Sequence, residues 1–183
     1  AVDLLQVLPP AVAAKYSDPR NFLRGEDEPR QAPPRTKRAG SLAEWTAIVC
    51  KLRDRKMVTF TATPKVVNGV FAVPKDADKD RFIIDARPAN CACREPDAVR
   101  LPTPDLTAAL TTDGSRKLYV AKVDLDNFYH RLRLPVAWQP YFALPKVRAA
   151  DVGVAHEFGA DAWVWPCCTT LPMGWSHSVL RRR

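Results

Sequence analysis

The sequence predicts an α+β protein with largely antiparallel strands. A capping signal precedes one run of apolar residues at helical spacing, several short apolar runs have the length and composition of strands, and turn-forming or charged residues separate them. The chain has 183 residues, of which 46% are hydrophobic and 26% are charged. This composition is typical of a domain with a packed core and excludes wholesale disorder.

Residues 1–40 are predicted to form a Pro-rich, basic lead-in or linker in an extended conformation. Six of the 17 prolines lie before residue 41, together with Gly25 and a basic run at 35–38. Proline and glycine in this density interrupt helices and strands. We therefore expect the folded domain to comprise residues 41–183.

The first element of this domain is expected to be a helix over residues 41–55. Ser41 and Glu44 have the spacing of a capping box, in which the side chain of each residue accepts a hydrogen bond from the backbone amide of the other. The apolar residues that recur at helical spacing are Leu42, Trp45, Ile48, Val49 and Leu52.

A hairpin with a charged tip is predicted next. Residues 66–73 end in an apolar strand, residues 75–80 form a charged turn, and residues 81–85 return as a second strand.

The second half of the chain is expected to contain one helix and three strands. A short helix is predicted at 105–112, followed by an apolar strand at 118–125 that ends in carboxylates. Residues 141–144 and 163–165 predict two further strands, which the loop 146–160 joins.

Charge and cysteine content narrow the classes of partner and location. The net charge of +8 is spread along the chain and fits attraction to nucleic acid phosphates. No apolar run has the length of about 18 residues that a membrane span needs, so we expect no membrane partner. An odd number of cysteines favours reduced thiols, and thus an intracellular location, cytoplasmic or nuclear.

Two candidate metal sites remain open on residue types alone. Asp124 and Asp126 follow an apolar run at the spacing of one strand face, where carboxylates can hold Mg²⁺ or can simply form a turn or cap a helix. A zinc site would combine His156 with four of the five cysteines, Cys91, Cys93, Cys167 and Cys168.

The segment 123–130 with the following 132–135 resembles the first catalytic motif of reverse transcriptases from retroviruses and LTR-type retrotransposons. The resemblance implies that Asp124 and the backbone carbonyl of Leu125 bind the catalytic metals, Mg²⁺ or Mn²⁺. It implies nucleotide-binding roles for Asn127 and Tyr129. Tyr129 would pack under the deoxyribose and exclude a 2′-hydroxyl, which favours a deoxynucleoside triphosphate and argues against an RNA-directed RNA polymerase.

The predicted hairpin resembles the fingers hairpin of the same family and the D-x-R-x-x-N segment that closes it. The resemblance implies that Lys75 and Arg81 grip the triphosphate of the incoming nucleotide. Two cations suit a polyanionic ligand, and arginine can bind it bidentately. Asp85, Arg87 and Asn90 are expected to hold the base of the hairpin.

A third segment, 171–178, resembles the family's L-P-Q-G-x-x-x-S motif. The resemblance implies that Met173 and Gly174 bind the nucleotide, with Gly174 allowing the backbone to approach the template. Methionine stands where the family usually has glutamine, and it cannot make the hydrogen bonds of that amide. His130 and His177 are expected to be surface or packing residues.

The resemblance covers roughly residues 41–180 and implies the fingers and partial palm of a right-hand polymerase. The implied activity is nucleotidyl transfer by a retroelement RNA-directed DNA polymerase on an RNA or DNA template-primer. The family's second metal-binding element, an aromatic-x-Asp-Asp hairpin, is not in this sequence. We therefore expect a truncated part of a longer polyprotein that is inactive alone. The alternatives are a non-catalytic nucleic-acid-binding remnant on the same scaffold and a small zinc-stabilised α+β protein.

Overall fold

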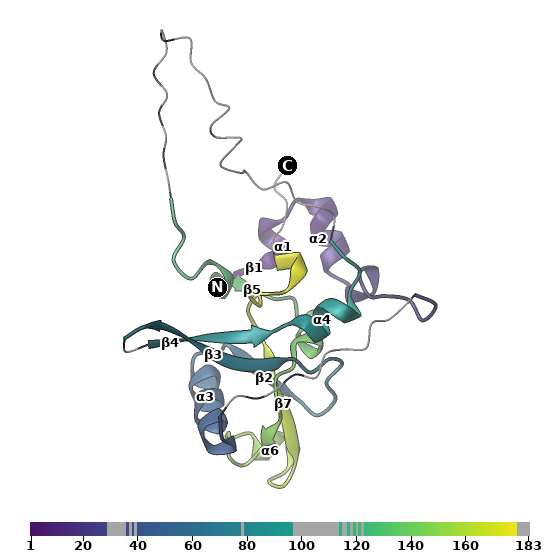
Figure 1. Cartoon of the computed structure of the whole chain (residues 1–183). Coiled ribbons are helices and arrows are strands. Elements are labelled where there is room, and N and C mark those ends of the chain that lie inside the picture. Colours follow the sequence, from purple (N-terminus) through teal and green to yellow (C-terminus); the bar gives the residue numbers. More distant parts are fainter. Residues whose placement is uncertain are drawn as a thin grey trace.

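The structure combines helices with small, mainly antiparallel sheets, in agreement with the α+β prediction (Figure 1). The computed structural model describes residues 1–28, 36, 38, 40–77, 79–96, 114, 117, 119, 121 and 123–178. In chain order, with η for 3-10 helices, the elements are β1 (Val2–Asp3), α1 (Leu4–Val7), α2 (Pro10–Tyr16), η1 (Pro19–Asn21), α3 (Leu42–Asp54), β2 (Val58–Thr61), β3 (Gly69–Asp76), β4 (Lys79–Asp85), α4 (Arg87–Ala92), η2 (Phe128–Arg131), β5 (Leu132–Arg133), η3 (Val136–Phe142), β6 (Val147–Arg148), α6 (Ala155–Phe158), β7 (Trp163–Cys168) and η4 (Ser176–Ser178). Within the described part of the chain, no helix has both the length and the apolar character that a bilayer crossing requires.

Three small sheets organise these strands. Strands β2, β7 and β6 form an antiparallel sheet with β7 in the centre. Strands β3 and β4 form a two-stranded antiparallel hairpin, and Val70 of β3 makes an isolated bridge to Arg38. Strands β1 and β5 form a short parallel pair. The predicted hairpin and the predicted strand at 163–165 are therefore confirmed.

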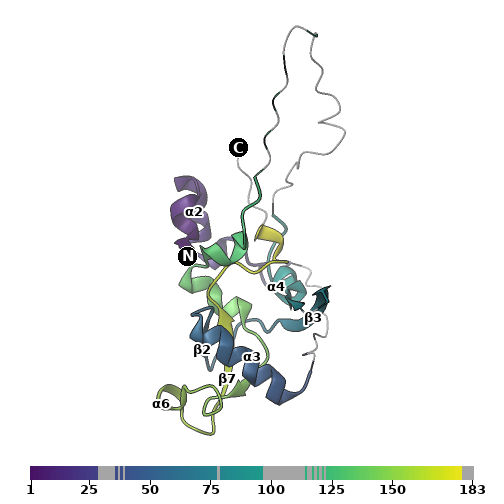
Figure 2. The same ribbon diagram turned by 90° about the vertical axis from the view of Figure 1, so that its left-hand side faces the viewer.

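Helix α3 confirms the helix that was predicted at 41–55. Ser41 Oγ accepts a hydrogen bond from the Glu44 amide at 3.2 Å, and Glu44 Oε2 accepts one from the Ser41 amide at 2.7 Å. Trp45 and Val49 are buried on its inner face. The helix lies beside β2 and contacts it (Figures 1 and 2).

Aromatic rings form the centre of the core. Trp138 and Trp175 lie with their ring centroids 4.8 Å apart, and Phe142 lies 5.0 Å from Trp175. His177 is buried beside them, as a packing residue. Its Nε2 lies 2.8 Å from the carbonyl of Arg94, which can only accept, so Nε2 carries the hydrogen.

Residues 1–28 are not extended, so this part of the prediction for residues 1–40 is wrong. Pro10 and Pro19 stand at the first positions of α2 and η1, where the missing amide hydrogen costs nothing because helix starts leave it unpaired. Leu4 and Tyr16 are buried in the core. The proposed domain boundary at residue 41 stays a prediction.

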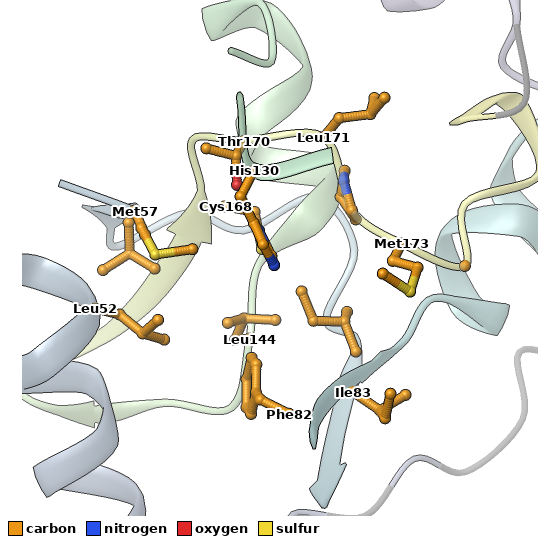
Figure 3. Close-up of a pocket in the computed structure, with 14 residues that line it drawn as sticks. Leu52, Met57, Phe82, Ile83, His130, Leu144, Cys168, Thr170, Leu171 and Met173 are labelled. Carbon is orange, nitrogen blue, oxygen red and sulfur yellow. The ribbon is translucent and has the colours of Figure 1, made fainter. Parts of the chain in front are cut away.

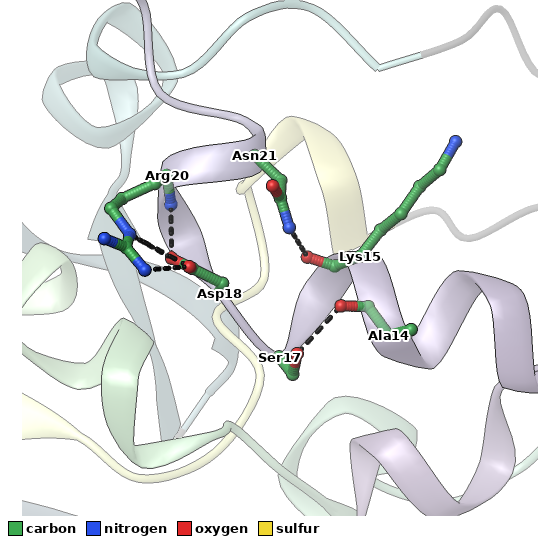
Figure 4. A network of polar contacts seen from close by, with 6 residues as sticks. All are labelled: Ala14, Lys15, Ser17, Asp18, Arg20 and Asn21. Carbon is green, nitrogen blue, oxygen red and sulfur yellow. Dashed lines mark hydrogen bonds and ion pairs between the residues drawn. The ribbon is translucent and has the colours of Figure 1, made fainter.

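Local polar contacts join α2 to η1 (Figure 4). Ser17 Oγ donates to the carbonyl of Ala14 at 2.8 Å, and Asn21 donates to the carbonyl of Lys15 at 3.0 Å. Asp18 accepts from the Arg20 amide at 2.9 Å and thereby caps η1. The turn between the two helices is thus closed by its own side chains.

The strand predicted at 141–144 is wrong. Tyr141 and Phe142 belong to η3, which contains Pro140, and a proline cannot donate a ladder hydrogen bond. Ala143 alone makes isolated bridges, one to Val67 and one to Cys167. The loop predicted at 146–160 likewise contains strand β6 and helix α6.

The strand predicted at 118–125 is not found among the described residues of that segment. Val123 and Leu125 are 82% and 61% exposed and lie outside any strand. A strand needs a hydrogen-bonded neighbour and a buried face, and neither is present there among the described residues. The helix predicted at 105–112 lies outside the described residues.

Candidate functional site

The β3–β4 hairpin carries the two cations that sequence reasoning selected. Its register pairs Val73 with Arg81 and Asp76 with Lys79, with an irregularity between Pro74 and Asp76. Lys75 lies in that irregularity, and Lys75 and Arg81 are both exposed. In Figure 1 the hairpin tip points away from the other labelled elements. Both cations are therefore available to a ligand near the tip.

The end of the hairpin is held by an ion pair. Arg87 Nη2 lies 2.6 Å from Asp85 Oδ2, and its Nε donates to Oδ1 at 2.7 Å. These hydrogen bonds hold the pKa of the Asp85 carboxyl below its ordinary value, although burial opposes them. Asp85 and Arg87 therefore join the end of β4 to the start of α4, and their role in holding the hairpin base stays a prediction.

Asn90 links the hairpin base to the segment with the third motif. Its Nδ2 donates to the carbonyl of Gly174 at 3.0 Å, and its Oδ1 accepts from the amide of Ser176 at 2.9 Å. Asn90 belongs to α4, which directly follows β4. Two motifs more than eighty residues apart in the chain therefore meet at one side chain.

Gly174 has a backbone conformation that favours glycine. Its φ is +105°, and a Cβ built there would lie 3.5 Å from the carbonyl oxygen of Ile84 in β4. That distance is an ordinary contact, so the positive φ and not the lack of space restricts this position. The predicted approach of Gly174 to a template stays a prediction.

A pocket of about 200 Å³ lies next to this junction (Figure 3). It is lined by Leu52, Met57, Val58, Phe82, Ile83, Ile84, His130, Leu144, Cys168, Thr170, Leu171, Pro172, Met173 and Gly174. Met173 is 48% exposed and stands at its mouth. The pocket thus brings two predicted nucleotide-binding residues, Met173 and Gly174, next to strand β4.

The first motif, residues 123–130, does not place its predicted metal ligands in the pocket. Asp124 and Leu125 are exposed and are not among the residues that line the pocket. Asp126 accepts from Asn127 Nδ2 at 2.9 and 3.0 Å and lies 3.6 Å from Arg131 Nη2. Asn127 has a left-handed φ of +51°.

Tyr129 is half-buried and packs against the hydrophobic core. Its ring lies 5.4 Å from that of Phe128, nearly perpendicular to it. The role of Tyr129 beneath a deoxyribose stays a prediction.

The predicted metal ligands do not assemble among the described residues. No group of three or more His, Cys, Asp or Glu side chains in that part of the chain is arranged to hold a metal ion. Mg²⁺ needs several oxygen ligands in near-octahedral geometry. The metal-binding role of Asp124 and of the Leu125 carbonyl stays a prediction.

The cysteines give no support to a zinc site. All five are free thiols, and burial raises the pKa of Cys93 to about 11 and that of Cys167 and Cys168 to about 12. His156 and the four cysteines of the predicted zinc site do not form a group that could hold a metal ion among the described residues.

Sequence reasoning missed Asn68, the fully buried residue before β3. Its Nδ2 donates to the carbonyls of Tyr141 and Ala143 at 3.0 and 3.2 Å, and its Oδ1 accepts from the Ala89 amide at 3.2 Å. In a sequence, Asn followed by Gly normally indicates a turn, so this pattern does not predict a buried, hydrogen-bonded asparagine. Asn68 holds the start of the hairpin and Asn90 holds its end.

Replacing Asn90 by alanine is expected to lower the free energy of unfolding by about 1–2 kcal/mol, because two hydrogen bonds of about 0.5–1.5 kcal/mol each are lost. It should also speed amide hydrogen exchange in β4 and around Gly174, because the link between them is gone. Hydrogen exchange with mass spectrometry measures this. Asn21→Ala, which removes one exposed hydrogen bond, is the control. Equal protection of both segments in Asn90→Ala and wild type would contradict the link.

No protein-family model matches the chain. A segment of 111 residues, 61% of the chain, is 31% identical to the Gag-Pro-Pol polyprotein of Human T-cell leukemia virus 2. The match spans only 7% of the length of that polyprotein. Over most of its length, the chain is therefore similar to a small part of a retroviral polyprotein.

Proposed function

We propose that this chain is the fingers and first palm portion of a retroelement RNA-directed DNA polymerase, acting as part of a longer polyprotein. The observation that carries the proposal is the Asn90 link, which joins the hairpin to the Gly174 segment. Both segments resemble reverse transcriptase motifs, and a polymerase needs them close together to hold one nucleotide. The similarity to part of a Gag-Pro-Pol polyprotein supports a retroelement origin.

The hairpin would hold the triphosphate of a deoxynucleotide through Lys75 and Arg81. Both are exposed on strands that meet at the hairpin tip. Charge-assisted contacts from an ammonium and a guanidinium are strong, and the planar guanidinium fits phosphate oxygens bidentately. The net charge of +8 would favour association with an RNA or DNA template-primer.

We assign binding, and not complete catalysis, to this chain. Nucleotidyl transfer uses two metal ions about 4 Å apart, held by carboxylates from two places. Asp124 supplies one such carboxylate, and the described residues do not complete the set. We therefore expect no primer extension by this chain alone with Mg²⁺ or Mn²⁺.

A second candidate is a non-catalytic nucleic-acid-binding module on the same scaffold. The exposure of Asp124, without a metal-ligand group around it among the described residues, favours this candidate. The two candidates differ in their response to a nucleotide. A polymerase portion should bind a primed template more tightly when the next complementary deoxynucleotide is present, whereas a binding module should not respond.

Fluorescence anisotropy with a labelled primed RNA template tests the proposal. Lys75→Ala/Arg81→Ala is compared with Lys15→Ala/Lys51→Ala, which removes the same charge from exposed sites on α2 and α3. Because Lys75 and Arg81 are assigned to the triphosphate, the hairpin variant should bind the primed template alone about as tightly as the control variant. We expect it to lose the tighter binding that the complementary deoxynucleotide gives, whereas the control variant keeps it.

An equal response to the complementary deoxynucleotide in both double variants would remove the assigned role of the hairpin. Wild-type binding without any response to the complementary deoxynucleotide would favour the non-catalytic module. Absence of binding by the folded chain would contradict both candidates.

A further inference from the structure

The pocket between α3, β4 and the segment after β7 has a closed, apolar floor. Val58, Leu144, Cys168 and Leu171 are all buried there. Phe82 and Ile84 of β4 form one wall, and residues 170–174 form another. The pocket of about 200 Å³ is thus open on the side of Met173 and His130 and closed by apolar side chains on the others.

Both methionines of the chain line this one pocket. The sequence contains two, Met57 and Met173. In Figure 3 they stand on opposite sides of the pocket. Methionine has an unbranched, polarizable side chain that adapts to ligands of different shape and makes favourable contacts with aromatic rings. Two such side chains around one void are typical of an adaptable binding site.

The polar groups of the pocket are few. Of the side chains that line it, those of Thr170 and His130 carry oxygen or nitrogen. His130 is exposed, so it stands at the mouth with Met173. A water cluster would need two to four polar partners for each molecule. An apolar ligand with at most one hydrogen-bonding group suits this lining better.

We propose that this pocket binds a small, apolar, one- or two-ring aromatic molecule of the indole type. An apolar cavity of about 150 Å³ admits benzene, so the larger volume here has room for a second ring. Exclusion of the rings from water by the buried floor drives binding. A ligand in this place contacts β4 on one side and the segment 172–174 on the other, and so holds the hairpin against that segment. The proposal does not depend on the polymerase assignment.

Methyl NMR of the full chain tests this directly. With ¹³C-methyl methionine labelling, the chain has two reporter groups, one for each methionine, and both belong to the pocket. Indole is titrated as the probe, and uracil, a polar single ring, is the control. We expect saturable shifts of both resonances with indole, with a dissociation constant on the order of 1 mM or tighter, and no saturable shift with uracil.

Two variants at the mouth sharpen the test. Met173→Glu introduces a charge at a half-exposed position, so the fold should persist while the affinity for indole falls at least about five-fold. Met173→Leu keeps an apolar side chain and should bind like wild type. Met57 remains the reporter in both variants, and its dispersed resonance shows that the chain is folded. Absence of shifts in folded wild type, an equal response to uracil, or unchanged affinity in Met173→Glu would overturn the proposal.

Discussion

Replacing Trp138 by alanine is expected to lower the free energy of unfolding by about 3–5 kcal/mol. The Trp138 side chain has no exposed surface. Its ring centroid lies 6.1 Å from that of Phe22 and 4.8 Å from that of Trp175, and its Nε1 donates to the carbonyl of Tyr16 at 2.7 Å. The substitution leaves a cavity in the aromatic cluster and removes the hydrogen bond from Trp138 to the carbonyl of Tyr16, so it weakens the packing of residues 1–28 on the core.

Urea unfolding followed by circular dichroism measures this loss. We expect a lower midpoint with an unchanged slope, because the folded state and the surface exposed on unfolding stay similar. Trp163→Ala is the matched control. Trp163 is only partly buried, and its ring contacts the cations of Lys146 and Arg148 at 4.8 and 4.5 Å. That variant should lose about 1 kcal/mol, and an equal loss in both variants would contradict the central role of Trp138.

Replacing Asn68 by alanine is expected to cost about 2–4 kcal/mol, because it leaves a buried donor and a buried acceptor without their partner. The donor is the amide of Ala89, and the acceptor is the carbonyl of Tyr141. The carbonyl of Ala143 keeps the hydrogen bond that it accepts from the backbone N–H of residue 68 at 2.8 Å. The loss should exceed that of Asn90→Ala, whose partners are closer to solvent.

Asn68→Asp gives the same site a pH dependence. An ionised carboxylate would face the two carbonyl oxygens that now accept from Asn68. Burial and these carbonyls favour the protonated form, so the folded-state pKa of Asp at this position is raised above its unfolded value. The variant should therefore be most stable at low pH and lose stability as pH rises through that raised pKa. Urea midpoints that do not change between pH 3 and pH 7 would contradict the buried geometry of this residue.

Local sequence signals predicted the elements that depend on neighbours in the chain. Ser41 and Glu44 cap α3 because they are three residues apart, whatever the rest of the protein does. The β3–β4 hairpin follows from two apolar runs around a charged turn. The Asp85–Arg87 pair also forms across two positions. For these elements the sequence was sufficient.

The predictions that were wrong concern segments whose structure depends on packing against distant parts of the chain. An apolar run such as 118–125 becomes a strand only when another strand pairs with it, and among the described residues none does. The prolines before residue 41 predict an extended segment, but Pro10 and Pro19 begin α2 and η1, and Tyr16 of α2 enters the core together with Leu4 of α1. A local sequence pattern does not predict which distant side chains a residue packs against.

The candidate site also combines features that neighbouring residues determine with features that depend on tertiary contacts. The sequence by itself determined the hairpin, its exposed Lys75 and Arg81, and the pairing at its base, because each of these arises from residues close together in the chain. Only the tertiary structure decided that Asn90 binds the Gly174 segment, that Asn68 is buried at the hairpin start, and that Met57 and Met173 enclose one pocket. These contacts join segments tens of residues apart, and the physical reason is that such side chains find their partners only when the core brings those segments together.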